Sequence, residues 1–137
     1  MHLITEYLAV GNAEDAAHPP WVMSAILNVA SENQVPPPGK DNYNWIPFTE
    51  FAAADPFQLD EAVSWLEHRE KGSRLLVCCR VGMGRSVSVA IAYLCLVERM
   101  PYQKAVDLVS ARRPGAMPLP ELEATIRFVR DLRQKRR

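Results

Sequence analysis

The stretch LLVCCRVGMGRSVSVAIAYLCL, residues 75–96, decides the fold. It begins as an apolar run of buried-strand length, passes through a turn with two glycines, and is apolar nearly all round from Ser86 onward. A strand covered on both faces that leads into a buried helix is typical of a parallel sheet flanked by helices. The stretch therefore predicts a strand–turn–helix unit at the centre of an α/β domain.

The turn CRVGMGRS, residues 79–86, predicts an anion-binding site. At such a turn, successive backbone N–H groups and the positive end of the helix dipole face one concavity. That environment stabilises a thiolate, so we expect Cys79 to be a nucleophile. Arg85 can present its planar guanidinium to two oxygens of a phosphate at once. Gly82 and Gly84 permit a close approach to the anion that side chains would obstruct.

The remaining pattern completes the α/β prediction. We expect strands within residues 2–12, 24–30, 43–48 and 74–79. The first predicted helix begins at Pro56, with Asp55 as its cap, and ends at Gly72. The second begins at Ser86 and ends in the turn before Pro101. Two more are expected over residues 102–113 and 120–137. The prediction is a single domain over residues 1–137, with a small, mostly parallel central sheet flanked by helices.

Composition limits the partners. Sixteen basic residues balance sixteen acidic ones, so no overall field favours nucleic acid or a membrane surface. The longest apolar run, 87–97, is far shorter than the ~20 residues that span a bilayer. Three cysteines do not make a secreted disulfide scaffold, and the three histidines lack metal-ligand spacing. We expect a cytoplasmic monomer that binds neither nucleic acid nor membrane.

The signature of a cysteine, five residues and Arg-Ser at a strand-to-helix turn resembles that of the cysteine-dependent protein tyrosine phosphatases. The chain length resembles their compact, atypical dual-specificity branch. The resemblance extends to ITEYLAVGNAEDAA, ILNVA and YQKAVDLVSARRPGA elsewhere in the chain. It implies a protein tyrosine phosphatase-like fold and activity on phosphorylated proteins or peptides.

The same resemblance implies the role of each residue in the turn. Cys79 would attack phosphorus to give a phosphocysteine, and Ser86 would stabilise the departing thiolate during hydrolysis. The phosphate oxygens would be held by Arg85 and by the loop backbone at Arg80, Val81, Gly82, Met83 and Gly84. No metal or cofactor would be needed.

Such chemistry also needs a general acid to protonate the leaving oxygen. In this family the acid is usually an aspartate, about thirty residues before the cysteine and after an Ile-Pro-like strand end. The matching residue is Glu50, and Asp55 is the alternative, although its position before Pro56 also suits a helix cap. Two further departures are Cys78, where the family usually has histidine, and Leu119, where it commonly has asparagine.

Several side chains have two interpretations. Cys78 either packs on the back of the strand or affects the oxidation of Cys79. Cys95 is expected to be a packing residue. Asn28 either braces the active-site loop or makes a strand-end hydrogen bond. Arg112 and Arg113 fit a helix C-terminus without a substrate role.

The leading functional interpretation is hydrolysis of phosphotyrosine in proteins, extending to phosphoserine and phosphothreonine, with selectivity from loops 31–44 and 49–55. One alternative is a phosphatase for a non-protein monoester, such as a phosphoinositide, a nucleotide or an RNA 5′ end. Another is a weakly active phosphate-binding module, which the replacements at Glu50 and Cys78 make conceivable.

Overall fold

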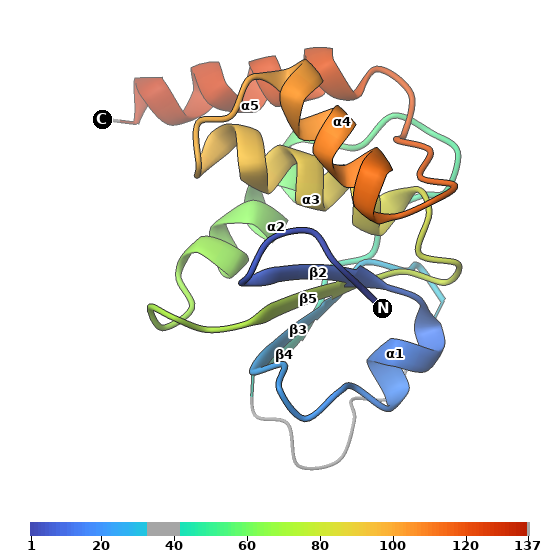
Figure 1. Cartoon of the computed structure of the whole chain (residues 1–137). Helices are drawn as coiled ribbons and strands as arrows, with labels where there is room; N and C mark the ends of the chain where they lie inside the picture. The colour runs from blue at the N-terminus through green and yellow to red at the C-terminus, as the bar shows by residue number, and fades with distance from the viewer. Residues whose placement is uncertain (33–41, 137) are drawn as a thin grey trace.

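In the computed structural model, which describes residues 1–32 and 42–136, short strands form one sheet that helices cover on both faces (Figure 1). The strands are β1 (His2–Leu3), β2 (Leu8–Gly11), β3 (Ala25–Asn28), β4 (Tyr43–Trp45) and β5 (Leu75–Cys78). The helices are α1 (Ala13–Ala17), α2 (Pro56–Glu67), α3 (Arg85–Leu96), α4 (Tyr102–Arg112) and α5 (Leu122–Lys135). The predicted α/β class is confirmed.

The sheet has the order β1-β2-β5-β3-β4, and only the β1–β2 pair is antiparallel. The central strand β5 is in parallel register with both neighbours, so that Cys78 is opposite Gly11 on one side and Asn28 on the other. The carboxyl ends of three strands thus lie at one edge of the sheet. The segments that follow them converge there, which is where parallel α/β sheets place their binding sites.

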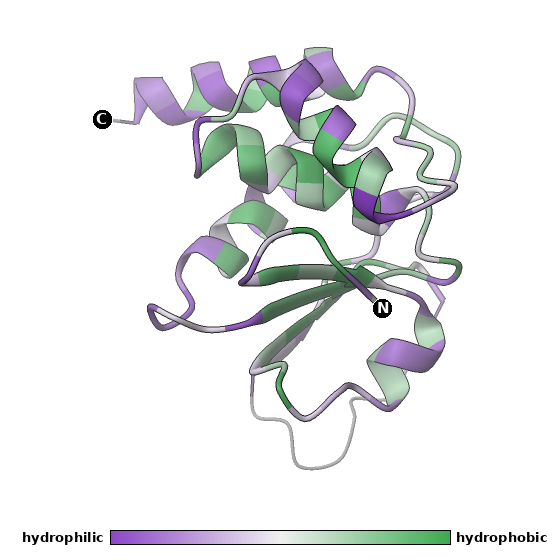
Figure 2. Ribbon diagram, in the orientation of Figure 1, coloured by the Kyte–Doolittle hydropathy of each residue, from purple (hydrophilic) through white to green (hydrophobic). Residues whose placement is uncertain are grey.

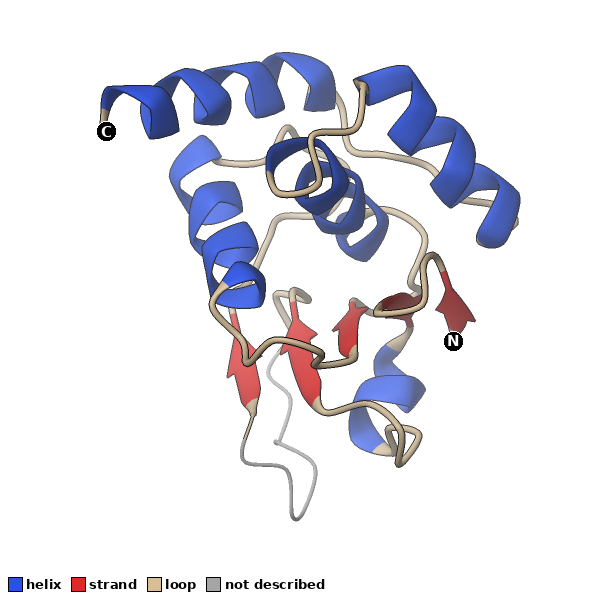
Figure 3. Cartoon of the chain, turned by 60° about the vertical axis from the view of Figure 1, so that its left-hand side comes forward, coloured by secondary structure: helices blue, strands red, loops and turns tan. Residues whose placement is uncertain are grey.

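The two faces of the sheet are covered unequally. Helices α2 to α5 lie over one face and the short α1 lies under the other (Figures 1 and 3). The central strand β5 is hydrophobic along its whole length, whereas α5 alternates between polar and apolar residues (Figure 2). The main core lies between the sheet and α2–α5 and contains Cys79, while Cys78 belongs to a smaller cluster on the α1 side. This split follows from the alternation of side chains along a strand.

The helix predicted to begin at Pro56 is shorter than expected. Helix α2 ends at Glu67, not at Gly72. Two side chains beyond its end contact backbone carbonyls of its last turn. The His68 ring nitrogen contacts the Ser64 carbonyl at 2.6 Å, and Arg69 Nε donates to the Trp65 carbonyl at 2.8 Å. Gly72 instead adopts a positive φ of 87° in the turn before β5. The C-terminal backbone groups of a helix accept any nearby donor, so glycine is only one way to end it.

Helix α1 was not predicted. Asn12 caps it in a reciprocal arrangement: its side chain accepts from the Asp15 N–H, and the Asp15 carboxylate accepts from the Asn12 N–H, both at 3.0 Å. The helix has five residues, too few for a periodic apolar pattern to show in the sequence. Over the described residues, no helix has the length and apolar character to cross a membrane.

Candidate active site

The predicted nucleophile lies at the sheet edge where the parallel strands end. Cys79 follows β5 directly, and its side chain is buried. Its Sγ accepts a hydrogen bond from the Gly82 N–H at 3.2 Å and is in hydrogen-bond contact with the Ser86 hydroxyl at 3.3 Å. The sulfur therefore has an N–H donor and a hydroxyl group within hydrogen-bonding distance. The structure therefore brings Cys79 and Ser86 together, as the signature implied.

The loop between β5 and α3 has its carbonyl groups turned outward. Each carbonyl from residue 80 to residue 84 accepts a hydrogen bond from another segment or from α3. Three backbone N–H groups donate to these carbonyls: Ala13 to the Arg80 carbonyl at 3.1 Å, Met117 to the Met83 carbonyl at 2.7 Å, and Ser88 to the Gly84 carbonyl at 2.9 Å. The Arg113 side chain donates to the Val81 and Gly82 carbonyls at 3.3 and 3.0 Å. The C=O and N–H of a trans peptide unit point in opposite directions. The N–H groups that share these peptide units therefore point into the concavity that the loop encloses, which is called the bowl below.

The amino end of α3 adds to the same bowl. The helix begins at Arg85, and no side chain caps its first turn. The first N–H groups of a helix have no partner within the helix, so they are available to an anion. Arg85 is 1% exposed although it is charged, and it is the largest of the fully buried side chains. The bowl thus combines loop amides, a helix terminus and a buried guanidinium.

Arg85 is held from several sides by long contacts. Its Nη1 donates to the Phe48 carbonyl and the Ser31 hydroxyl, both at 3.3 Å. Glu32 accepts from both terminal nitrogens, at 3.4 and 3.5 Å, and a Glu50 carboxylate oxygen is 3.9 Å from Nη2. A hydrogen bond from its own backbone N–H and the charge of Arg85 lower the pKa of Glu32.

Of the two candidate acids, Glu50 lies at the site and Asp55 does not line it. Glu50 and Cys79 line the same cavity, which has a volume of about 370 Å³. The Asp55 carboxylate instead accepts from the Phe57 and Gln58 N–H groups, at 2.8 and 3.2 Å, at the start of α2. This is the capping role that its position before a proline suggested.

The rim of the cavity is apolar. Phe51, Val81 and Met117 line it and are 78%, 53% and 68% exposed. Leu119, the residue that departs from the family's usual asparagine, lines the wall and is buried. Its backbone N–H donates to the Ser88 hydroxyl at 2.8 Å, which in turn donates to the Gly84 carbonyl at 2.8 Å. The backbone of Leu119 is therefore linked through Ser88 to the loop between β5 and α3, and this link does not depend on the side chain at position 119.

The other singled-out side chains lie apart from the cavity. Cys78 is fully buried on the α1 side, where burial raises the pKa of its thiol. Asn28 accepts from the Ala30 N–H at 3.0 Å and donates to the Tyr43 hydroxyl at 3.2 Å, a strand-end arrangement. Cys95 is buried in α3 beside a separate hollow of about 720 Å³, and burial raises the pKa of its thiol too.

Sequence reasoning missed two contributors. Arg113 was assigned only to a helix end, yet it is buried against the loop carbonyls. Glu32 was not singled out, although a carboxylate four residues after the end of a parallel strand can reach the shared edge. Loop 49–55 contributes Glu50 and Phe51 to the cavity, whereas residues 33–41 of the predicted 31–44 loop lie outside the described residues.

No metal-binding group is evident in the part of the chain that the structure describes: it has no cluster of three His, Cys, Asp or Glu residues that could hold a metal ion. The site can act on an anion through a sulfur nucleophile, amide donors and a guanidinium, with a carboxyl group beside them. These are the parts of nucleophilic catalysis assisted by a general acid.

The chain is similar in sequence to known phosphatases. The family described as "Dual specificity phosphatase, catalytic domain" matches residues 20–137. Dual specificity protein phosphatase 1B of Arabidopsis thaliana is 31% identical over 123 residues, covering 85% of this chain and 74% of that protein. Human dual specificity protein phosphatase 5 is 29% identical over 121 residues, covering 84% of this chain but only 32% of the relative.

The fold has solved counterparts. The crystal structure of human DUSP28 matches with a TM-score of 0.84, 22% sequence identity and full coverage of both chains. The family match covers most of the chain, and the Arabidopsis relative exceeds 30% identity over most of both proteins. The chain therefore belongs to the dual specificity phosphatase family.

Proposed function

We propose that this protein hydrolyses phosphate monoesters on proteins, phosphotyrosine foremost, through a phosphocysteine intermediate. The observation that carries the proposal is the environment of Cys79 Sγ, which has an N–H donor at 3.2 Å and a hydroxyl at 3.3 Å in the cavity that Arg85 and Glu50 also line. The family supports protein phosphatase activity in general. The preferred phosphorylated side chain and the role of each residue are our inference.

In the first step, Cys79 Sγ attacks phosphorus as the ester P–O bond breaks. Arg85 and the loop amides hold the equatorial oxygens, where charge is concentrated in the transition state. Glu50, as the carboxylic acid, gives its proton to the leaving oxygen. The products are the free alcohol or phenol, a phosphocysteine and the Glu50 carboxylate.

In the second step, water attacks phosphorus and loses a proton to the Glu50 carboxylate. The S–P bond breaks, and its electron pair returns to Cys79. The Ser86 hydroxyl and the Gly82 N–H then stabilise the thiolate that leaves. Inorganic phosphate is released, and every group returns to its starting protonation state.

The apolar rim favours an aromatic ester. A phosphotyrosine ring can pack on Phe51, Val81 and Met117, whose exposed surface would be removed from water. A phosphoinositide or an RNA 5′ end carries further phosphates, which would call for additional cations at the rim. Among the described residues that line the cavity there is no lysine, and Arg85 is the one arginine. This composition supports phosphotyrosine over the polyanionic alternatives.

The test is hydrolysis of p-nitrophenyl phosphate and of phosphotyrosine, phosphoserine and phosphothreonine peptides, without added metal, from pH 4.5 to 8. We expect Cys79→Ser to abolish turnover and phosphotyrosine to be the best peptide. A phosphatase that prefers a phosphoinositide or an RNA 5′ phosphate over all three peptides would contradict the substrate class. Phosphopeptide binding without turnover would identify a binding module instead.

Two isosteric changes separate the candidate acids. Glu50→Gln removes the proposed proton donor, so we expect the loss of turnover to grow as the leaving group becomes poorer. Asp55→Asn also removes an acid but keeps an oxygen that can cap α2, so the fold is retained and turnover should not change. The reverse pattern would assign the acid to Asp55.

A further inference from the structure

The phosphate loop packs against one buried arginine from a distant element. Arg113 follows α4, is 5% exposed, and makes two hydrogen bonds to the loop. Its Nε donates to the Gly82 carbonyl at 3.0 Å and its Nη2 donates to the Val81 carbonyl at 3.3 Å. The Val81 carbonyl shares its peptide unit with the Gly82 N–H, and the Gly82 carbonyl shares its unit with the Met83 N–H.

The direction of those units follows from Arg113. A trans peptide unit is planar, and its C=O and N–H point to opposite sides. When Arg113 holds the Val81 and Gly82 carbonyls outside, the N–H groups of Gly82 and Met83 face inward. The Gly82 N–H indeed donates to Cys79 Sγ at 3.2 Å. The guanidinium thus sets the orientation of two amides in the bowl without lining the cavity itself.

The packing behind Gly82 leaves little freedom for another arrangement. Gly82 has a φ of 80°, and a Cβ placed there would meet the Arg113 guanidinium and would lie 2.6 Å from the Gly11 carbonyl oxygen. Glycine is therefore required both by the backbone angle and by the close approach of Arg113. The loop and the arginine fit each other as one unit.

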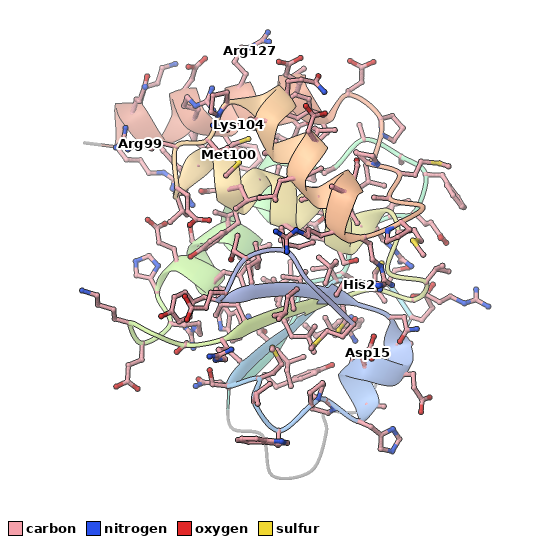
Figure 4. The ribbon with its side chains drawn as sticks, in the orientation of Figure 1. His2, Asp15, Arg99, Met100, Lys104 and Arg127 are labelled. Carbon is pink, nitrogen blue, oxygen red and sulfur yellow. The ribbon has the colours of Figure 1, made fainter. Side chains whose placement is uncertain are left out.

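The third nitrogen of Arg113 is held by the first strand. Nη1 is 2.7 Å from Nδ1 of His2, which belongs to the edge strand β1 and lies below the carboxyl end of α4 in the view of Figure 4. A guanidinium has only donors, so the imidazole Nδ1 is the acceptor in this contact. Each of the three guanidinium nitrogens then has a partner, which leaves the arginine a single orientation.

We propose that Arg113 is a positioning residue that aims the Gly82 and Met83 N–H groups at the substrate phosphate, and that His2 holds Arg113 in place. This rests on the proposed phosphatase function, because the aimed amides matter for catalysis only if a phosphate occupies the bowl. These contacts link His2 in β1, the loop carbonyls of residues 81 and 82, and Arg113 at the carboxyl end of α4.

The test compares Arg113→Met with Arg112→Met, since Arg112 is the exposed neighbour of the same type. Circular dichroism reports folding, initial rates give kcat and KM, and calorimetric titration with tungstate measures affinity for an oxyanion. We expect Arg113→Met to lower kcat/KM by about 10²-fold, as loss of an oriented donor does, and to weaken tungstate binding at least about tenfold. Arg112→Met should leave both unchanged.

The outcomes separate the two proposals. A purely structural role would reduce the folded fraction but leave KM and the tungstate affinity of the folded protein unaltered, which would overturn the positioning role. A wild type that binds tungstate without hydrolysing any ester would overturn the phosphatase function. Weaker tungstate binding by Arg113→Met in that case would still support the aimed amides.

A second pair of variants applies even if Arg113→Met does not fold. His2→Asn keeps an acceptor near the position of Nδ1, whereas His2→Leu removes it. We expect His2→Leu to lower kcat/KM several-fold and to weaken tungstate binding, and His2→Asn to restore both toward the wild-type values. Equal behaviour of the two variants would overturn the role of His2.

Discussion

Two arginines of this protein are partly or fully buried among carboxylates, but they are held differently. Arg133, on α5, donates to Asp60 at 2.9 Å, to Glu67 at 3.0 Å and to the Ser64 hydroxyl at 3.0 Å. Arg85, at the candidate site, has contacts of 3.3–3.5 Å and a further carboxylate at 3.9 Å. Arg85 is nevertheless the more deeply buried of the two.

The difference is the one that we expect between a structural cation and the proposed phosphate-binding one. A buried charge is costly unless it is paired and hydrogen-bonded, and Arg133 meets that condition with short contacts to α2. Arg85 keeps long contacts, so its guanidinium retains hydrogen-bonding capacity for two oxygens of a phosphate. The fold holds its charge in place in advance, so binding a dianion requires little further ordering.

The same substitution at both arginines gives the largest expected effect. Arg85→Lys keeps the charge but loses the planar pair of donors, so we expect kcat/KM for an aryl phosphate to fall by about 10²–10³-fold. Arg133→Lys should leave kcat/KM unchanged, since that residue faces α2 rather than the cavity. Equal losses in the two variants would mean that Arg85 acts only through folding.

Binding of an oxyanion should distinguish the two positions next. At a tungstate concentration 100 times its dissociation constant, the wild type should gain about 2.7 kcal/mol of unfolding free energy by linkage. Arg85→Lys should gain clearly less at the same concentration, because its affinity is lower. Thermal unfolding with and without tungstate measures this, and an equal gain in Arg85→Lys would place the anion elsewhere.

The structural arginine should instead show its effect on stability. Arg133→Met leaves Asp60 with Arg136 as its remaining cation at 2.7 Å, so we expect a loss of about 1–2 kcal/mol in unfolding free energy. Arg127→Met is the matched control, because Arg127 is 65% exposed and its pair with Glu123 is at 3.9 Å. Urea unfolding compares them, and a larger loss for Arg127→Met would contradict this ranking.

The smallest effect concerns the carboxylate that faces Arg85. The lowered pKa of Glu32 means that its charged form is favoured in the folded state. It therefore contributes stability above the unfolded pKa near 4.5, and that contribution is lost as the pH falls through the lowered folded value. We expect Glu32→Gln to be slightly less stable than the wild type at pH 6 and equal to it at pH 2.5. A difference that persists at pH 2.5 would have another cause.

Much of the site follows from local sequence. The apolar strand, the glycines of the turn and the buried helix lie within residues 75–96, and their order places Cys79, Arg85 and Ser86 around one loop. The alternation of side chains along β5 likewise separates Cys78 from Cys79. These are short-range geometric relations, so the sequence is enough to predict them.

Other features depend on which distant segments meet. The sequence left Glu50 and Asp55 as competing acids, and only the paths of their loops put one in the cavity and the other on a helix end. The sequence assigned Arg113 to a helix end, but its side chain folds back onto a loop about thirty residues earlier.

The sequence by itself determined the α/β class, the strand–turn–helix unit and the anion-binding loop, because these depend on backbone geometry and on periodicity over a few neighbouring residues. The tertiary structure alone decided what surrounds that loop: the carboxylates facing Arg85, the apolar rim, and the contact of Arg113 with His2. Those contacts join residues separated by up to 111 positions. Their formation depends on how all the elements pack together, which no local pattern records.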